Sequence, residues 1–465
     1  MGKFREGQDR KQITFLPPSI DEYVAADDGV RLIDELINQL DLSAIEGSYS
    51  EQGRRGYSPT ILVKILVFGK IEGIRSSRKL AQACRDSLRF IYLAKGERPD
   101  FRTISDFRKK HIESLGSILK QTVELGVSEG VIKLSHVAVD GTKLRANASL
   151  KSYRSPQYLE AFVEELEQSL QEDIELDDEE DSSHGDDGDG GMRLPKGLEE
   201  REKLRDKVKS TLEKAKKTAS RVSTTDNDSR IMRGPEGKRS SYNAQAAIDE
   251  KSMMFVGAYA TNSGSDSNEM RRIIDEIEST SGGTPKQLSA DRGYNATDGL
   301  VALEEKGIEG FVPLPRSSHK QKITQEHFLY DEENDEYICP QGRSLIPHIQ
   351  RQNADEYKSE DCSGCNLSQE CLSQSGANRV IKVSHYADTI KRMQQRMSLE
   401  RGKRMYKRRS QSIELAFAWM KRHKKLKQFI FRTLKEVSAE WRFECAAINI
   451  WRLASIRAKS IHALA

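Results

Sequence analysis

Three acidic residues have the types and positions that metal-dependent chemistry requires. Asp140 and Asp291 are expected to end two separate strands, after residues 134–139 and 285–290, and each is followed closely by Gly. Glu414 lies far downstream in a basic region. In mixed α/β sheets, sites form beyond the strand ends, where loops bring side chains together. Three carboxylates gathered there suit hard divalent cations such as Mg²⁺. Two such ions can activate a water or a 3′-hydroxyl and stabilise the leaving oxygen of a phosphodiester, so the set predicts phosphoryl transfer.

The surroundings of Glu414 predict contact with nucleic acid. Between Lys391 and Lys435 there are sixteen Lys or Arg against two acids, Glu400 and Glu414. Cations at this density repel one another and are typical of surfaces that meet phosphates. On the alternative interpretation, Glu414 simply pairs with the neighbouring cations. The side chains expected to contact DNA are Tyr406, Arg409, Lys421, Lys424 and Lys425.

Four cysteines within about thirty residues predict a structural metal site. They are Cys339, Cys362, Cys365 and Cys371. Two of them form a Cys-x-x-Cys pair, and such a set suits a closed tetrahedral zinc site, with His348 as an alternative ligand. Disulfides are disfavoured because no export signal is recognisable. Cys84 and Cys445 lie in apolar helical contexts and are expected in the core.

The chain has 465 residues, enough for two or three domains. No run of eighteen apolar residues is present, so no membrane span is expected. No apolar segment follows the first residues, which predicts a cytoplasmic protein. The net charge of +3 averages over an uneven distribution, since residues 160–189 hold fifteen Asp or Glu and no Lys or Arg. This segment ends in a Gly- and Asp-rich stretch, 181–191, that predicts a disordered linker. A calcium loop is disfavoured because the bidentate Glu that it needs is missing.

Residues up to about 130 have helical patterns. The run 57–71 has the apolar spacing of a buried helix, with Pro59 in its first turn. A further helix is predicted over 102–111, where Thr103 and Asp106 stand at capping-box spacing. Short helices rich in Arg and Lys are compatible with a helix-turn-helix DNA reader, although most short helical hairpins are only structural.

The middle of the chain alternates between strand and helix patterns. The predicted strands cover 134–142, 242–249, 254–261, 285–291 and 310–314, and the predicted helices between them cover 267–279 and 297–306. The polar joint 250–252 predicts a hairpin. The alternation predicts a mixed α/β sheet with helices packed on it. An acidic helix ending near 180 and a basic helix over 198–222 interrupt this pattern, and the chain is helical again from Lys391 onward.

The segments around the three acids resemble a known family. They are Val137-Ala-Val-Asp-Gly-Thr-Lys, Ser289-Ala-Asp-Arg-Gly-Tyr-Asn and Tyr406-Lys-Arg-Arg-Ser-Gln-Ser-Ile-Glu-Leu-Ala-Phe-Ala-Trp-Met-Lys. They look like the acidic motifs of bacterial insertion-sequence transposases of the DDE type. Segments similar to one subgroup are Gly73–Leu80, Arg102–Arg108, Thr225–Met232 and Tyr242–Asp249. The resemblance extends from about Tyr57 to Trp451.

This resemblance implies an α/β fold, with an RNase H-like mixed-sheet catalytic core that is interrupted by insertions and preceded by an all-α N-terminal domain. Residues 1–130 would form the N-terminal, DNA-binding domain. The first part of the catalytic domain would cover 131–315, with an insertion at about 150–238. A Cys-rich, zinc-binding insertion would follow at 316–378, and the second catalytic part, with basic C-terminal helices, would cover 379–465.

The resemblance also implies an activity. Asp140, Asp291 and Glu414 would bind two Mg²⁺ ions, for which Mn²⁺ can substitute. The enzyme would cut DNA at the terminal inverted repeats of its insertion sequence and join the freed 3′-hydroxyls to target DNA. A homodimer on DNA is expected, because two ends must be held together. The alternatives are a DNA-binding protein without activity and a nuclease of the same fold that cuts without joining.

The resemblance further assigns a Tyr-Arg-Glu-Lys signature, here Tyr406, Arg409, Glu414 and Lys421. The gap between Arg and Glu is one residue longer than in the commonest form, so Arg408 is an alternative to Arg409. Some relatives stack a flipped base on a Trp between the second and third acids when they excise through a DNA hairpin. No Trp lies between those acids here, which counts against that route.

Overall fold

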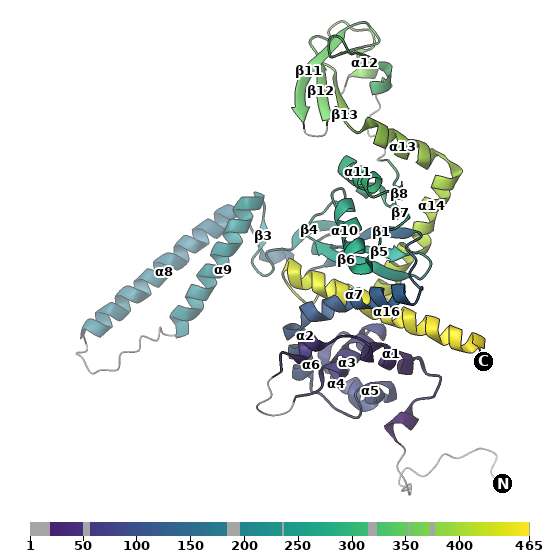
Figure 1. Ribbon diagram of the computed structural model, residues 1–465. Coiled ribbons are helices and arrows are strands. Elements are labelled where there is room, and N and C mark those ends of the chain that lie inside the picture. Colours follow the sequence, from purple (N-terminus) through teal and green to yellow (C-terminus); the bar gives the residue numbers. More distant parts are fainter. Residues whose placement is uncertain are drawn as a thin grey trace, which may run out of the picture.

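The structure of the protein is a computed structural model that describes residues 19–49, 56–183, 196–234, 237–314, 323–351, 354–372 and 377–464. Of the expected linker 181–191, residues 184–191 lie outside these ranges. Figure 1 shows a central sheet with a helical region on one side, a small β unit on the other, and a two-helix arm. None of the described helices is long and apolar enough to cross a bilayer.

The region before the sheet is helical. Its helices are α1 (Gly29–Asn38), α2 (Ser43–Glu46), α3 (Pro59–Ile71), α4 (Ser77–Asp86), α5 (Leu88–Leu93), α6 (Phe101–Lys110) and α7 (Ile112–Ser128). As the sequence predicted, α3 is buried along its length with Pro59 at its start. Its buried Lys64 is paired with Asp34 at 2.6 Å.

The predicted cap of the helix over 102–111 is wrong. Helix α6 begins at Phe101, and its N-cap is Asp100 rather than Thr103. The Asp100 carboxylate accepts hydrogen bonds from the backbone N–H groups of Arg102 at 2.7 Å and Thr103 at 3.1 Å. Because Asp100 already satisfies these exposed donors, the helix starts before the capping box that the sequence suggested.

Within the described ranges, the main sheet has six strands. They are β1 (Val137–Arg145), β4 (Arg230–Gly234), β5 (Gly237–Asp249), β6 (Met254–Thr261), β7 (Gln287–Ala290) and β8 (Glu309–Phe311). The strand order is β6–β5–β1–β7–β8, with β4 pairing the first part of β5. Strands β6, β5 and β1 pair antiparallel, whereas β1, β7 and β8 run parallel. This order is that of the RNase H-like fold and confirms the predicted fold class.

The predicted hairpin at 250–252 is present, since it joins the antiparallel strands β5 and β6. Strand β4 departs from the expected boundaries. It lies inside the expected insertion 150–238, yet it extends the main sheet.

Six helices that follow or alternate with the strands pack on this sheet. They are α10 (Met270–Ser281), α11 (Thr297–Glu305), α13 (Ala387–Ser398), α14 (Glu400–Gln411), α15 (Ile413–Arg422) and α16 (Leu434–Leu464). Helices α7, α10 and α16 contact β6, and α14 and α15 contact β1. The helical region therefore shares one buried apolar cluster with the sheet. At the crossing of α7 and α16, a Cβ added to Gly116 would come within 2.9 Å of the Ala439 backbone, so only glycine permits this approach.

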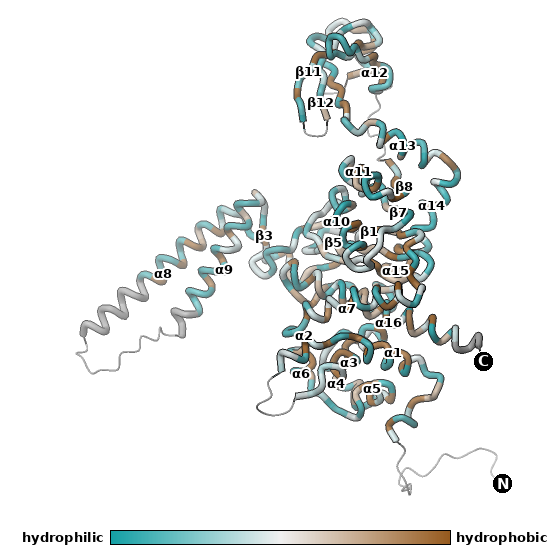
Figure 2. Tube along the Cα trace, viewed as in Figure 1, coloured by the Kyte–Doolittle hydropathy of each residue, from teal (hydrophilic) through white to brown (hydrophobic). Residues whose placement is uncertain are grey.

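Two further parts extend from the main body. The arm consists of β2 (Tyr153–Arg154), α8 (Pro156–Ser183), α9 (Lys196–Thr218) and β3 (Val222–Ser223). Figure 2 shows that hydrophilic residues predominate along α9. The β unit consists of β9 (Leu329–Asp331), β10 (Glu336–Ile338), β11 (Ser344–Arg351), β12 (Ala354–Ser359), α12 (Ser368–Cys371) and β13 (Val380–Ser384). It has its own small apolar core.

Candidate active site

The fold brings Asp140 and Asp291 to neighbouring strands. The parallel pairing of β1 with β7 ends at the pair Val139 and Ala290. Asp140 and Asp291 are the residues that directly follow this pair. The prediction that Asp140 ends its strand is wrong, because β1 continues to Arg145 through its antiparallel pairing with β5. Asp140 instead marks the point where the parallel partner stops. Glu414 lies in the first turn of α15, which packs on β1.

Arg409 joins the three carboxylates. Its Nη1 is 3.0 Å from Asp140 Oδ2, and its Nη2 is 2.7 Å from Glu414 Oε1 and 3.9 Å from Asp291 Oδ1. The Arg409 side chain is 7% exposed, whereas those of Asp291 and Glu414 are 49% and 45% exposed. The site is therefore a buried cation with one partly buried carboxylate, that of Asp140, and two accessible carboxylates around it. Glu414 does pair with an arginine, as the alternative interpretation held, but that arginine also faces both strand aspartates.

Burial and charge act against each other at this site. Burial raises the pKa of Asp140 to about 6, and the nearby Asp291 and Glu414 carboxylates add to this rise. The Arg409 guanidinium and the Gly141 N–H oppose it. Burial disfavours the charged guanidinium, but the surrounding carboxylates raise the pKa of Arg409. The three acids would repel one another without a shared cation, which explains why a positive group lies between them.

Of the other signature residues, Tyr406 contacts an acid and Lys421 lies beside β1. Tyr406 donates a hydrogen bond of 3.3 Å to Asp291 Oδ1. Lys421 donates to Thr142 Oγ1, two residues beyond Asp140 on β1. Arg408, the alternative to Arg409, points elsewhere and pairs with Glu250 at 3.4 Å. The structure thus brings Arg409, and not Arg408, to the carboxylates.

The two other lysines that were expected to contact DNA have different environments. Lys424 donates to the Ile71 carbonyl at the end of α3, and its ammonium lies 4.3 Å from the centroid of the Trp419 ring. Burial lowers the pKa of Lys424. Lys424 therefore connects the helical region to the loop after α15, whereas Lys425 is exposed.

Beneath the acids lies a polar network that sequence reasoning did not assign. Asp266 accepts hydrogen bonds from the side-chain amides of Asn243 at 2.7 Å and Gln245 at 2.6 Å. Gln245 in turn accepts a hydrogen bond from the buried Tyr294 hydroxyl. A Cβ at Gly141 would meet this network within 2.8 Å, which explains the Gly that follows Asp140. Asn243, Gln245 and Tyr294 lie in segments that carried the resemblance, but Asp266 had no sequence pattern to indicate it.

The Thr225–Met232 segment has a positioning contact. The Asp226 carboxylate accepts a hydrogen bond from the Thr433 N–H at 3.2 Å, and Asp228 accepts one from the Leu434 N–H at 3.0 Å. These donors begin α16, where carboxylates are favoured by the free N–H groups and the helix dipole. The segment therefore fixes the start of the helix that packs along α7.

The four cysteines of the predicted zinc site line one small cavity in the β unit. Backbone N–H groups of Arg343 and Arg379 point at the sulfurs of Cys339 and Cys362, at 3.3 and 3.4 Å. Burial raises the pKa of Cys371, and neighbouring cysteines add to the rise. The alternative ligand His348 is exposed on β11. Cys84 and Cys445 are buried, as predicted.

Within the described ranges, no three or more Asp, Glu, His or Cys side chains are arranged as a metal-binding group. The side chains at the two candidate metal sites nevertheless have the donor atoms that the predicted ions prefer. Carboxylate oxygens suit Mg²⁺ and thiolates suit Zn²⁺. At the acids, the three carboxylates already surround one positive charge, that of Arg409. A metal ion held there would take the place of that guanidinium.

Two family comparisons match this chain. Residues 338–454 match the family described as "Transposase DDE domain", and residues 18–110 match the family described as "Transposase domain (DUF772)". The first match contains Glu414, and the second covers α1 to α6. None of the curated proteins matches the chain significantly.

Solved transposase structures show distant similarity. The chain is 9% identical to the piggyBac transposase in its synaptic complex with hairpin DNA, with a TM-score of 0.27 over 94% of this chain and 74% of that one. It is 9% identical to the Mos1 transposase in its paired-end complex, with a TM-score of 0.16 over 59% of this chain and 65% of that one. TM-scores this low do not establish a shared overall fold.

Proposed function

We propose that this chain, whose matched domains are both transposase domains, cuts DNA at the ends of its own insertion sequence and joins those ends to target DNA. The observation that carries the proposal is the convergence of Asp140, Asp291 and Glu414 from β1, β7 and α15 on one guanidinium. Residues so far apart in sequence meet only because the RNase H-like sheet aligns them. Since its DNA would be the bacterial chromosome, the proposed location is the cytoplasm.

The proposed chemistry consists of two phosphoryl transfers. In the first, a water oxygen bonds to the phosphorus at the element's end, and the bond to the 3′-oxygen breaks. In the second, that 3′-oxygen attacks a target phosphorus and displaces the target's own 3′-oxygen. Asp140, Asp291 and Glu414 would hold two Mg²⁺ ions, or Mn²⁺ in their place, which supply activation of the attacking oxygen and charge neutralisation.

The chain's own residues would position the DNA. Once displaced from the carboxylates, the buried Arg409 would present its guanidinium to the phosphate beside the cut, since a planar fork matches phosphate oxygens. Lys421 would hold a neighbouring phosphate from its place beside Thr142. Tyr406, which donates to Asp291, would keep that carboxylate oriented.

The experiment that tests this function is a cleavage and strand-transfer assay with the purified full chain, Mg²⁺ and DNA that carries the element's ends. Nicks at the ends together with joined products are expected. Nicks without joined products would contradict joining and identify a nuclease. Tight binding with no nicks in Mg²⁺ or Mn²⁺ would contradict both activities and identify a DNA-binding protein.

The geometry separates the two candidate arginines in the same assay. Arg409→Ala is expected to lower the cleavage rate at least about a hundredfold, because it removes the cation that all three carboxylates contact. The matched control is Arg408→Ala, which loses only the pair with Glu250 and is expected to cleave at nearly the wild-type rate. Circular dichroism would verify that both variants are folded. Equal losses in the two variants would contradict the assignment of Arg409.

We further propose that Cys339, Cys362, Cys365 and Cys371 bind one structural Zn²⁺. The proposal is supported by their shared cavity and by the N–H groups that point at two of the sulfurs, since such bonds favour thiolates. Zinc would stabilise a unit whose own apolar core is small.

Replacement of Cys362 and Cys365 together by Ser should therefore abolish zinc binding and lower the unfolding temperature of the β unit. Elemental analysis of the purified protein measures the metal, and limited proteolysis reports on the unit. His348→Ala is the control, and it should retain full zinc because His348 is exposed on β11. A wild-type protein purified without chelators that contains no zinc would contradict the site.

The remaining parts of the proposal concern partners. The helical region 1–130 would bind the terminal inverted repeats, which is supported by the match of residues 18–110 to a transposase domain. A homodimer on DNA would hold the two ends together during joining.

A further inference from the structure

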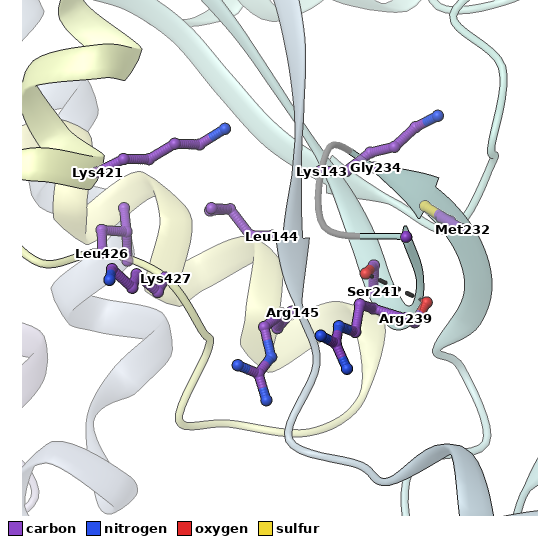
Figure 3. Close-up of a pocket in the computed structure, with 11 residues that line it drawn as sticks. Lys143, Leu144, Arg145, Met232, Gly234, Arg239, Ser241, Lys421, Leu426 and Lys427 are labelled. Carbon is purple, nitrogen blue, oxygen red and sulfur yellow. Dashed lines mark hydrogen bonds between the residues drawn. The ribbon is translucent and has the colours of Figure 1, made fainter.

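The hydrogen-bonded network around Asp266 lies on the face of the sheet opposite to the candidate active site. Successive side chains of a strand point to opposite faces, so Leu144 shares its face of β1 with the acid four residues before it. Figure 3 shows this alternation, since Leu144 points toward Lys421 of α15, whereas Lys143 points to the other side of β1. Gly141 belongs to the face of Lys143, against which the network packs.

Four side chains form the Asp266 network, which consists of Asp266, Asn243, Gln245 and Tyr294. Asp266 Oδ1 accepts hydrogen bonds from Asn243 Nδ2 at 2.7 Å and from Gln245 Nε2 at 2.6 Å. Gln245 Oε1 accepts a hydrogen bond from the Tyr294 hydroxyl. The three partners of Asp266 are at most 1% exposed. A buried polar group without a partner costs about 1–3 kcal/mol, so these bonds hold the side chains in one arrangement.

The Asp266 carboxylate decides which way the Gln245 amide faces. A carboxylate can only accept hydrogen bonds, so it must meet the amide nitrogen and not the amide oxygen. In the reversed orientation, Gln245 Oε1 would face Asp266 Oδ1, and two acceptors would meet without a proton between them. The amide oxygen is therefore always presented to the Tyr294 hydroxyl. The charge of Asp266 thus reaches Tyr294 through the orientation of a single amide.

The network contacts the backbone directly after Asp140. Gly141 of β1 pairs with Gln245 of β5. A Cβ added to Gly141 would lie 2.5 Å from Gln245 Nε2 and 2.7 Å from Asp266 Oδ1. The amide and the carboxylate therefore occupy the space that a side chain would fill. A reoriented amide would press on the strand that carries Asp140.

The network also holds the turn that follows Asp291. Tyr294 ends this turn, and its N–H donates to the Asp291 carbonyl at 3.0 Å. Its hydroxyl is bonded to the amide on β5. A Cβ added to Gly293 would lie 3.4 Å from Asp266 Oδ2, so the carboxylate lies against the same turn. One network thus contacts the backbone next to both strand aspartates.

We propose that Asp266 is a positioning residue for the two strand aspartates. Acting through Gln245 and Tyr294, it sets the distance between their carboxylates, which would share divalent cations. The inference rests on the proposed function, because it presupposes ions between these aspartates. Since the network lies on the opposite face of β1, its effect passes through the backbone and not through contact with an ion. Loss of a group that orients metal ligands commonly weakens metal binding by about ten- to a hundredfold.

The test measures binding of Mn²⁺ to the full chain by electron paramagnetic resonance of the free ion, without DNA. Asp140→Ala identifies the binding that depends on the site. Asp266→Asn keeps the shape of the side chain but removes the charge that orients the Gln245 amide. Tyr294→Phe removes only the hydroxyl that the amide accepts. Each of these two network variants is expected to weaken the Asp140-dependent binding by at least about tenfold.

A double variant tests whether the two residues act through one route. Asp266→Asn together with Tyr294→Phe should bind Mn²⁺ within about threefold of the weaker single variant, because both changes interrupt the same path. Two residues that acted independently would have effects that multiply.

Two controls separate positioning from a general loss of stability. Tyr259→Phe removes another buried hydroxyl of the same sheet, which donates to Glu269 Oε2 at 2.9 Å. It should lower the melting temperature about as much as Tyr294→Phe does, as measured by circular dichroism, and yet bind Mn²⁺ as wild type does. Asp275→Asn removes an exposed acid from α10 and should also bind normally.

Unchanged Mn²⁺ binding in Asp266→Asn, an equal loss in Tyr259→Phe, or losses that multiply in the double variant would each overturn the proposal. Wild type without Asp140-dependent binding would overturn it as well. The nicking assay separates this inference from the proposed function. Nicking by wild type together with unchanged Mn²⁺ binding in Asp266→Asn would overturn the positioning role and leave the function standing. Weakened binding in both network variants without nicking by wild type would support the role and count against the function.

Discussion

Replacement of Asp140, Asp291 or Glu414 by Ala is expected to lower Mg²⁺-dependent nicking at least about a hundredfold while DNA binding stays close to that of wild type. Each change removes one carboxylate from the set that surrounds Arg409. Loss of one group that stabilises charge in a transition state commonly has an effect of this size. DNA binding should persist, because the cations that would meet phosphates remain in place. Gel-based nicking and anisotropy measure the two properties separately.

A matched control shows whether lost nicking comes from the site itself or merely from the removal of a negative charge in this region. Glu400 begins α14, its side chain is 89% exposed, and its ion pair is with Lys403. Glu400→Ala therefore removes a carboxylate from the same basic region without touching the site, and it should cut normally. Nicking within tenfold of wild type by any one of the three site variants would remove that residue from the assignment.

Glu444→Gln is expected to destabilise the protein by about 3–5 kcal/mol, because it breaks a buried ion pair and leaves cations without their partner. Glu444 Oε1 lies 2.5 Å from Lys70 Nζ and 2.7 Å from Arg75 Nη2, and its side chain is 3% exposed. Burial alone would raise the pKa of Glu444, but these two cations lower it to about 2. The carboxylate is thus held in its charged form between the helical region and α16.

The same network includes Glu440, which accepts hydrogen bonds from the Ile430 and Phe431 N–H groups at 2.9 and 3.1 Å. It therefore also fixes the loop between α15 and α16. The shift of the denaturation midpoint, followed by circular dichroism, measures the effect of Glu444→Gln. The control is Glu113→Gln, which breaks an exposed ion pair with Lys435 between α7 and α16. Exposed pairs contribute little to stability, so an equal shift in both variants would contradict the importance of burial.

Several parts of this protein could be predicted from the sequence because they depend on local patterns. The order of β1, β5, β6, α10, β7, α11 and β8 follows from alternation of period two against apolar spacing of period 3.6, whereas β4 was not predicted. The all-round apolar character of 61–71 predicted a buried helix, and α3 is one. The three acids were found by their neighbours in sequence, since each lies in a short motif.

Other features depend on contacts between distant residues. The chain was expected to be helical from Lys391 onward, but α14 ends at Gln411 and α15 begins at Ile413, and Ser412 between them has a φ of −115° and a ψ of −87°. The break changes which side chains face the sheet, so spacing along one helix could not decide between Arg408 and Arg409. Lys424 and Lys425 are alike in the sequence, and only the structure shows that the Lys424 ammonium donates to the Ile71 carbonyl while Lys425 is exposed.

The sequence by itself thus indicated the three candidate acids and most of the elements that carry them, because periodicity and short motifs are local properties of the chain. Only the tertiary structure decided that Asp140 lies within β1 rather than at its end, that Asp266 hydrogen-bonds to Gln245 behind the acids, and that Arg409 lies between the three carboxylates. The physical reason is that burial, charge partners and empty space are set by packing between segments hundreds of residues apart. No pattern within one segment encodes them.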